Sequence, residues 1–126
     1  MVLLHGLNDS YLTWRRVAPG LAVDRRILLP DLAGHGLSER PDANYTLAWH
    51  SKIIARWLET LNLERVDLIG HSFGGGVAQM LLLECAGRIR RMVLVAPGGL
   101  GRGVTPALRL ASLPHAVELM AGFMSG

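Results

Sequence analysis

The segment Gly70-His-Ser-Phe-Gly74 places a serine two residues from a glycine on either side. It follows the apolar run at 66–69 and precedes a stretch of helical character, so the serine would stand on a tight strand-to-helix turn. Such a turn strains the backbone and presents the hydroxyl at the edge of a sheet, beside the positive end of a helix. Ser72 is therefore the candidate nucleophile, with Gly70 and Gly74 required because side chains there would come too close.

A serine hydroxyl is a weak nucleophile that needs a base about 3 Å away and donors for the oxyanion that forms on the attacked carbonyl. The backbone N–H of Phe73, which starts the following helix, is one natural donor. The second donor should come from the loop after the first strand, where His5-Gly6-Leu7 lies, and we assign it to the N–H of Leu7. These residues predict nucleophilic attack on a carbonyl carbon.

Two other interpretations of the glycine-rich segment were weighed. Gly74-Gly75-Gly76 at the start of a helix suggests a phosphate-binding loop. The sequence matches neither standard pattern, because it has no Gly-x-x-x-x-Gly-Lys and no Gly-x-Gly-x-x-Gly here. A glycine-rich turn without chemistry is the second alternative. We favour close packing of helix on sheet as the reason for the extra glycines.

Short apolar runs alternate with stretches of helical periodicity along the chain. The expected strands are 2–4, 26–30, 65–69 and 92–95, and the expected helices are 12–22, 46–61 capped by Thr46, 73–86, 105–112 and 115–124, with a loop at 31–45. This order predicts the α/β class, a doubly wound parallel sheet with helices on both faces. His5, Asp31, Ser72 and Ala96 all follow strands, at the edge where such sheets bind ligands.

Histidines and one aspartate near these strand ends were considered as catalytic groups. His71 precedes the nucleophile, so its side chain should point away from that of Ser72. His5 and His35 are expected to make structural hydrogen bonds within their loops. Asp31 has the place of a catalytic acid, but we favour a bracing role in which its carboxylate accepts N–H groups of the 32–36 turn. No histidine pair has metal-ligand spacing with a third ligand nearby, so no metal is expected.

Composition narrows the function classes further. The chain has 126 residues, half of them hydrophobic, which fits one modest folded domain. No apolar run reaches the roughly 18 residues of a membrane span, and the first residues lack the basic region of a signal peptide, so a cytoplasmic location is expected. The net charge of +3 comes from dispersed arginines, which argues against nucleic-acid binding. We expect no cofactor and no membrane partner.

Four segments together resemble the α/β-hydrolase superfamily, in its branch of small cytoplasmic serine hydrolases with a helical cap: His5-Gly6 with Trp14, Asp31–Ser38, Gly70–Gly75 and Arg91–Pro97. Their order and spacing look like the third to sixth strands of that family, over essentially the whole chain. The resemblance implies Ser72 as nucleophile and Phe73 and Leu7 as oxyanion donors. It also implies supporting roles for His5, Gly6, Gly70, His71, Gly74 and Gly75. Residues 1–100 would form a partial hydrolase core and 101–126 the start of the cap.

The family places a catalytic acid and then a histidine after strands that follow the nucleophile. After Ser72 the sequence offers only Glu84 and Glu118 as acids and His115 as histidine, and none of them follows a later strand. We therefore expect neither the triad acid nor the triad histidine in this chain, which looks like an interior fragment. Missing neighbouring strands would leave sheet edges open to self-association.

The resemblance implies a serine hydrolase that acts on a small, apolar ester, amide or related carbonyl substrate through an acyl-enzyme. Without the triad partners, this chain alone would be weak or inactive. A serine rather than an aspartate at the nucleophile disfavours epoxide hydrolases and haloalkane dehalogenases, while carboxylesterase, carbon–carbon bond hydrolase and cofactor-free acyl transferase stay open. The rival interpretation is a non-catalytic or vestigial protein that binds a ligand or oligomerises.

Overall fold

The computed structural model describes residues 1–98, which form a parallel sheet of three strands in the order β1-β2-β3. The strands are β1, Val2–Leu4, β2, Val66–His71, and β3, Ile89–Val95. Leu3 pairs with Ile69, and Gly70 with Leu94, so the three carboxyl ends meet at one edge of the sheet. The parallel sheet confirms the α/β fold class.

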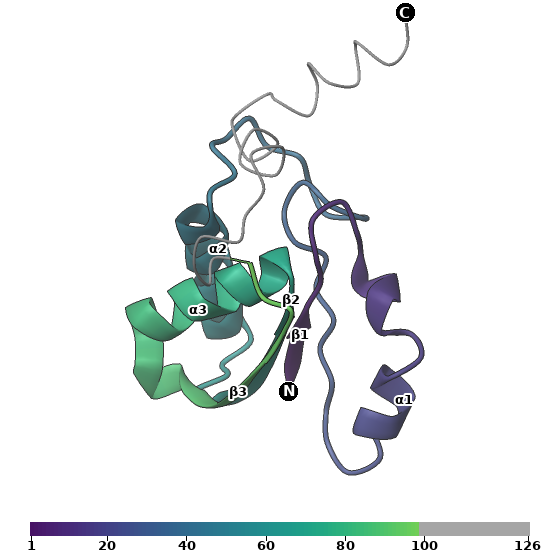
Figure 1. Ribbon diagram of the computed structural model, residues 1–126. Helices are drawn as coiled ribbons and strands as arrows, with labels where there is room; N and C mark the ends of the chain where they lie inside the picture. The colour runs from purple at the N-terminus through teal and green to yellow at the C-terminus, as the bar shows by residue number, and fades with distance from the viewer. Residues whose placement is uncertain (99–126) are drawn as a thin grey trace, which may run out of the picture.

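Helices lie on both faces of this sheet (Figure 1). The two long helices, α2, Leu47–Thr60, and α3, Phe73–Cys85, pack on each other and cover one face. The short segments η1, Tyr11–Trp14, and α1, Ala18–Leu21, lie on the other side (Figure 1). One further turn, η2, Ala86–Arg88, leads from α3 into β3. None of the helices within residues 1–98 is long and apolar enough to cross a membrane.

The hydrophobic core fills the space between the sheet and the two long helices. Alternate residues of β2 point into it, because successive side chains of a strand face opposite sides. From α2 and α3 the buried residues recur at helical spacing. The core consists of Val2, Leu4, Leu32, Ile54, Leu58, Val66, Leu68, Val77, Ala78, Leu81 and Ile89.

The helix expected at 46–61 is confirmed as α2. Its cap is Thr46, whose side-chain oxygen accepts a hydrogen bond from the N–H of Trp49 at 3.1 Å. This bond satisfies one of the free amides of the first helical turn. The helix expected at 73–86 is likewise confirmed as α3.

The continuous helix expected at 12–22 is wrong, because the chain there forms two single turns, η1 and α1. The reason is Pro19, which has no N–H and whose ring would clash with the carbonyl of Arg15 in an unbroken helix. Proline is compatible with the first turn of a helix, and α1 begins around it.

The strand expected at 26–30 is reduced to a single bridge between Val2 and Leu28. Leu28 donates to the carbonyl of Met1 at 2.9 Å and accepts from the N–H of Leu3 at 3.0 Å. The next bond of a parallel ladder would run from residue 30 to the carbonyl of Leu3. Residue 30 is a proline and has no N–H to donate, so the ladder stops there.

β3 begins three residues before the expected start at Met92. A register shift between Val66 and Asp67 accommodates Arg90 as an extra residue of β3. Because of this shift, the guanidinium of Arg90 donates two hydrogen bonds to the buried carboxylate of Asp67, and the one from Nε to Oδ1 is 2.8 Å long. The helices expected at 105–112 and 115–124, and the cap at 101–126, lie outside the described residues.

The packing of α3 yields a paired prediction. Leu81 is fully buried in the core, whereas Leu83, two residues away on the same helix, is 79% exposed. Leu81→Ala should lower the free energy of unfolding by about 3 kcal/mol, because it removes buried methyl groups and leaves a cavity. Leu83→Ala should change it by less than about 0.5 kcal/mol. Urea unfolding followed by circular dichroism measures both, and equal losses would contradict the described core.

Candidate active site

Ser72 joins β2 to α3 with a backbone φ of 51° and ψ of −115°, a left-handed conformation that side chains disfavour. Holding a residue there costs about 1–3 kcal/mol, so the surroundings must fix it. The N–H of Ser72 donates to the carbonyl of Val95 at 3.0 Å, which ties the turn to the end of β3. Its carbonyl accepts from three amides, those of Gly75, Gly76 and Gly98, the last at 2.7 Å.

The glycines around Ser72 mark close approaches of backbone to backbone. A side-chain carbon on Gly74 would lie 2.4 Å from the carbonyl oxygens of Leu4 and His5, and one on Gly70 would lie 2.6 Å from the carbonyl oxygen of Gly74. Both distances are far inside van der Waals contact, and backbone cannot move aside easily. These positions let α3 begin directly against the end of β1. Close packing thus explains the glycines.

The loop after β1 runs alongside Ser72. A side-chain carbon on Gly6 would lie 3.4 Å from Cβ of Ser72 and 3.3 Å from Nδ1 of His71. Leu7 follows in the chain and is 36% exposed. Among residues 1–98, neither the N–H of Leu7 nor that of Phe73 donates to a protein acceptor. Two backbone donors thus flank Ser72 with their hydrogen-bonding capacity unused.

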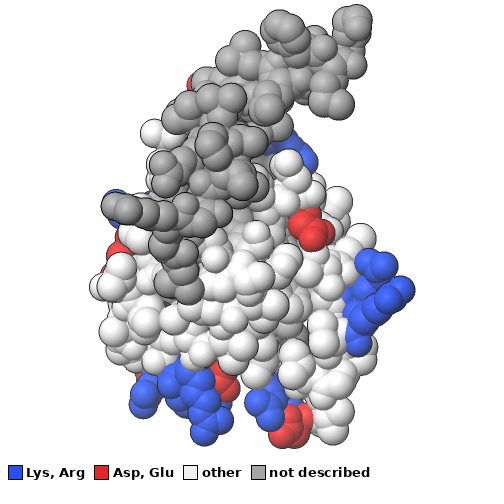
Figure 2. Space-filling model, in the orientation of Figure 1, with Lys and Arg blue, Asp and Glu red and all other residues white. Residues whose placement is uncertain are grey.

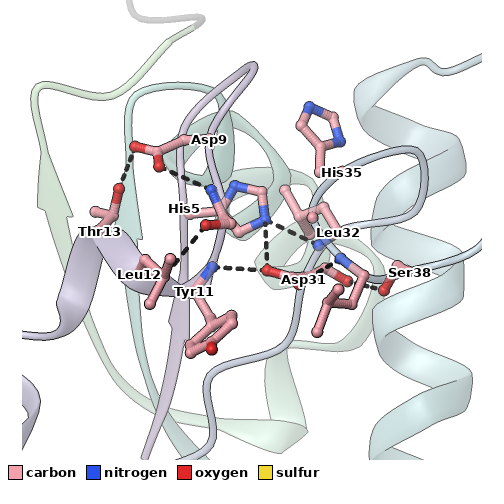
Figure 3. Close-up of polar contacts among 12 residues, drawn as sticks. His5, Asp9, Tyr11, Leu12, Thr13, Asp31, Leu32, His35 and Ser38 are labelled. Carbon is pink, nitrogen blue, oxygen red and sulfur yellow. Dashed lines mark hydrogen bonds and ion pairs between the residues drawn. The ribbon is translucent and has the colours of Figure 1, made fainter.

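His5 joins this loop to the segment that begins at Leu32 (Figure 3). Its ring is fully buried, Nδ1 lies 2.8 Å from the carbonyl oxygen of Gly6, and Nε2 lies 3.0 Å from the N–H of Leu32. The amide of Leu32 must donate to Nε2, so Nδ1 carries the proton and donates to Gly6. Burial lowers the pKa of His5, and the hydrogen bond to Gly6 opposes this to a smaller degree. His5 is therefore a neutral clamp between two strand ends.

Asp31 braces two loops through its carboxylate (Figure 3). Oδ1 accepts from the N–H of Tyr11 at 2.6 Å, and Oδ2 accepts from the N–H of Leu37 at 2.8 Å. The bracing role is confirmed, but the expected partners within the 32–36 turn are wrong. The turn brings the N–H of Leu37, rather than those of residues 32–36, to the carboxylate. Gly36, at φ +49°, makes room for the carboxylate, because a side-chain carbon there would collide with Oδ2 of Asp31.

The sequence pattern of the alpha/beta hydrolase fold matches residues 1–124 of this chain. The chain belongs to the alpha/beta hydrolase fold family. In that family setting, the turn at Ser72 and the loop of His5 and Gly6 occupy adjoining strand ends of one sheet.

Named relatives share this region of the family. The chain is 40% identical over 121 residues to the uncharacterized protein Rv2715 of Mycobacterium tuberculosis. The matched region makes up 96% of this chain and 36% of the relative. It is 38% identical over 113 residues to 2-hydroxymuconate semialdehyde hydrolase of Pseudomonas sp. strain CF600, covering 86% of this chain and 40% of that enzyme.

A solved structure agrees with these relatives. The meta-cleavage product hydrolase CumD of Pseudomonas fluorescens superposes with a TM-score of 0.78 at 32% identity, over 86% of this chain and 42% of that structure. The chain therefore spans about two fifths of the length of the hydrolases that it matches.

One acidic side chain that follows Ser72 is engaged elsewhere within residues 1–98. Glu84 lies on α3 and accepts a hydrogen bond from the hydroxyl of the buried Ser51 on α2 at 2.8 Å. The ring of His71 stands edge-on to that of Trp14, with centroids 6.5 Å apart, and its buried Nδ1 has no hydrogen-bond partner among the described residues. Glu118 and His115 lie outside the described residues. Neither Glu84 nor His71 is hydrogen-bonded to Ser72.

Two features of the site were missed by the sequence analysis. Gln79 on α3 donates from its side chain to the carbonyls of Gly75 and Gly98, at 3.1 and 3.0 Å, and so closes the turn after β3 onto the helix. The turn residues Pro97 and Gly98 were the available signal. The second feature is His50, which the sequence places only on a helix. Its ring is 1% exposed and packs edge-on against Phe73 at 5.1 Å.

A hollow of about 400 Å³ lies at the amino ends of the strands, away from Ser72. Its lining combines Arg25, Arg26, Arg65, Arg90 and Arg91 with Asp24 and Asp67. Figure 2 shows basic and acidic side chains together along the lower edge of the molecule. Because this family binds ligands at the carboxyl ends of the strands, we do not assign the hollow to the site.

The buried histidines predict a pH dependence of stability. Burial is the largest cause that lowers the pKa of both His5 and His50 below the ordinary value of 6.5. The unfolded chain then binds protons that the folded chain excludes, so the stabilisation is full above the unfolded pKa and is lost as pH falls through the folded values. We expect the urea midpoint to decrease between about pH 7 and pH 5.

Substitution tests this assignment. His50→Gln should reduce the decrease, and Lys52→Gln, an exposed change on the same helix, should leave it intact. A midpoint that stays constant or rises on acidification would contradict the prediction.

Proposed function

We propose that this chain carries the nucleophile and oxyanion-binding part of a serine hydrolase acting on a small ester, amide or related carbonyl substrate. The observation that carries the proposal is the turn at Ser72, with its φ of 51° and the unused N–H groups of Leu7 and Phe73 on either side. Strained backbone at a strand end is typical of functional sites. Membership of the alpha/beta hydrolase fold family supports the same chemistry.

In this proposal Oγ of Ser72 attacks the carbonyl carbon and its proton passes to a base. The carbonyl oxygen becomes an oxyanion and accepts hydrogen bonds from the amides of Leu7 and Phe73. Each such donor stabilises the transition state by about 3 kcal/mol. Collapse of the intermediate expels the leaving group and leaves an acyl-enzyme, which water then hydrolyses. Because neither Glu84 nor His71 is hydrogen-bonded to Ser72, we expect the isolated chain to be slow, and loss of triad partners costs up to about 10⁶-fold.

The substrate proposal draws on the relatives. A hydrolase named for 2-hydroxymuconate semialdehyde is 38% identical to this chain, which favours a small carbonyl compound as substrate. An acyl transferase is the related alternative, in which an acceptor other than water releases the acyl group. This alternative is supported by a relative from Cupriavidus necator that is named as the dihydrolipoyllysine-residue acetyltransferase component of an acetoin cleaving system and is 33% identical over 104 residues.

The second candidate function is a non-catalytic protein that binds a ligand or self-associates. It is favoured by β3, whose outer edge pairs with no strand among residues 1–98. Val93 and Val95 of this strand are 52% and 44% exposed, which is unusual for β-branched residues of a parallel sheet. An unpaired strand of this kind invites another chain.

Covalent labelling tests the nucleophile. We expect a fluorophosphonate probe to label the purified protein at Ser72 slowly, on prolonged exposure, since phosphorus would take the place of the substrate carbonyl and its oxygen would use the same two amides. Ser72→Ala should reduce labelling to background, while Ser125→Ala serves as the matched control and should label normally. A folded wild-type sample that takes up no probe even on prolonged exposure would overturn the hydrolase proposal and favour the binding protein.

Self-association is tested independently by sedimentation equilibrium. The average mass should rise with protein concentration if the edge of β3 pairs with a second copy. Val93→Lys places a charge on the exposed strand and should weaken association at least about tenfold. Val23→Lys, at a site that is 83% exposed, is the control and should have no effect. A monomer at every concentration would refute association through this edge.

A further inference from the structure

The imidazole of His50 lies where three separate segments meet. The ring is 1% exposed and belongs to the first turns of α2. Nδ1 lies 3.0 Å from the carbonyl oxygen of Thr46, the residue that caps this helix. Nε2 lies 3.1 Å from the carbonyl oxygen of Ala33, in the loop that follows the Leu28 bridge. The side chain therefore spans from the start of α2 to the 31–38 loop.

The carbonyl of Ala33 serves two imidazoles. Nδ1 of His35 lies 3.0 Å from the same oxygen, so the two lone pairs of one carbonyl match one N–H from each ring. His35 belongs to the loop itself, and this contact confirms that it ties down its own turn. His50 comes from outside, so its bond is the one that fixes the loop to α2.

The same ring also supports Phe73, the first residue of α3. His50 stands edge-on to the ring of Phe73, with centroids 5.1 Å apart and an interplanar angle of 88°. His35 stacks on that ring at 6.1 Å and 27°. Edge-on and offset arrangements of this kind are the ones that aromatic rings favour. The side chain of Phe73, whose backbone N–H is the proposed oxyanion donor, thus packs against both histidines.

The tautomer of the His50 ring decides which segment it is bonded to. A neutral imidazole has one N–H, so it donates either to Thr46 or to Ala33. The carbonyl of Thr46 already accepts the backbone N–H of His50 at 3.0 Å. The carbonyl of Ala33 likewise faces one other ring nitrogen, Nδ1 of His35 at 3.0 Å, so the number of donors does not distinguish the two carbonyls. A bond from Nδ1 would stay within the start of α2, and a bond from Nε2 is the one that joins the loop to the helix.

We propose that His50 is a positioning residue that, through an Nε2–H bond to the carbonyl of Ala33 and edge contact with Phe73, holds the Phe73 amide in place for an oxyanion at Ser72. This inference rests on the proposed function for the role of the amide, but not for the contact itself. The hydrogen-bond partners of the ring are main-chain carbonyls and not Ser72. It acts by joining the 31–38 loop to the start of α3.

Two variants separate the hydrogen bond from the packing. His50→Phe keeps an aromatic edge against Phe73 and removes both hydrogen bonds. His50→Gln keeps an N–H that can reach Ala33 and gives up the ring. Lys52→Gln, exposed on the same helix, is the matched control. Urea unfolding of every variant distinguishes a positional effect from a general loss of stability.

The first readout is the labelling of Ser72 by the fluorophosphonate probe. His50→Phe should lower the limiting labelling rate about tenfold and leave the half-saturating probe concentration unchanged, because the oxyanion donor acts on the transition state. His50→Gln should recover part of the rate. A limiting rate in His50→Phe equal to that of wild type, in a folded sample, would overturn the proposal.

The second readout does not need activity. Nitrogen NMR of the wild-type protein should show the proton of the neutral His50 ring on Nε2, and the N–H order parameter of Phe73 should be lower in His50→Phe than in the wild type at unchanged global stability. If the wild-type protein takes up no probe, the proposed function fails and this readout alone decides. A proton on Nδ1, or an unchanged order parameter at Phe73, would overturn the positioning role.

Discussion

The contact between the start of α3 and the end of β1 governs the geometry of the whole carboxyl edge. It is so close that Gly74 has no space for a side chain against the carbonyls of Leu4 and His5. This proximity fixes where α3 can begin, and so obliges Ser72 to turn the chain in a left-handed conformation. The cost of that conformation is small beside the burial of the core residues of α3, which require the helix to lie where it does. Core packing thus maintains the strain at the turn.

Two histidines near the turn bind the backbone. Both ring nitrogens of His5 are taken by main-chain groups, and both of His50 face main-chain carbonyls. The proposed function thus has two parts with different structural needs. Oxyanion binding would depend on local backbone, whereas proton transfer would need a base side chain beside Ser72.

Local signals predicted the parts of the fold that depend on local physics. The turn at Ser72 was predictable because its glycines and flanking elements are adjacent in sequence, and α2 because Thr46 and the apolar spacing act within one helix. The break at Pro19 was visible, but apolar spacing was given more weight than the missing N–H. The extent of pairing at Leu28 depends on its register against β1, which no local pattern specifies.

The site, like the fold, was predictable where its contacts are local in the sequence and not where they join distant segments. Asp31 was recognised as a brace, yet one of its donors, Tyr11, lies 20 residues away in the chain. His50 carried no signal at all, because its surroundings combine Ala33, Thr46 and Phe73, three segments that only the folded chain brings together. Its position on a helix was visible, and its partners were not.

The two borders of the sheet differ as templates for a further strand. On the side of β1 the bordering segment contributes one bridge, at Leu28, and so presents almost no ladder for another chain to extend. On the other side β3 is seven residues long and lacks a neighbour among residues 1–98. When two copies pair through the same edge, neither copy has that edge left for a third. A fibre instead requires two different edges of each copy that can pair with each other. If two copies paired through β3, as proposed, the contact would therefore close at a pair rather than extend into a fibre.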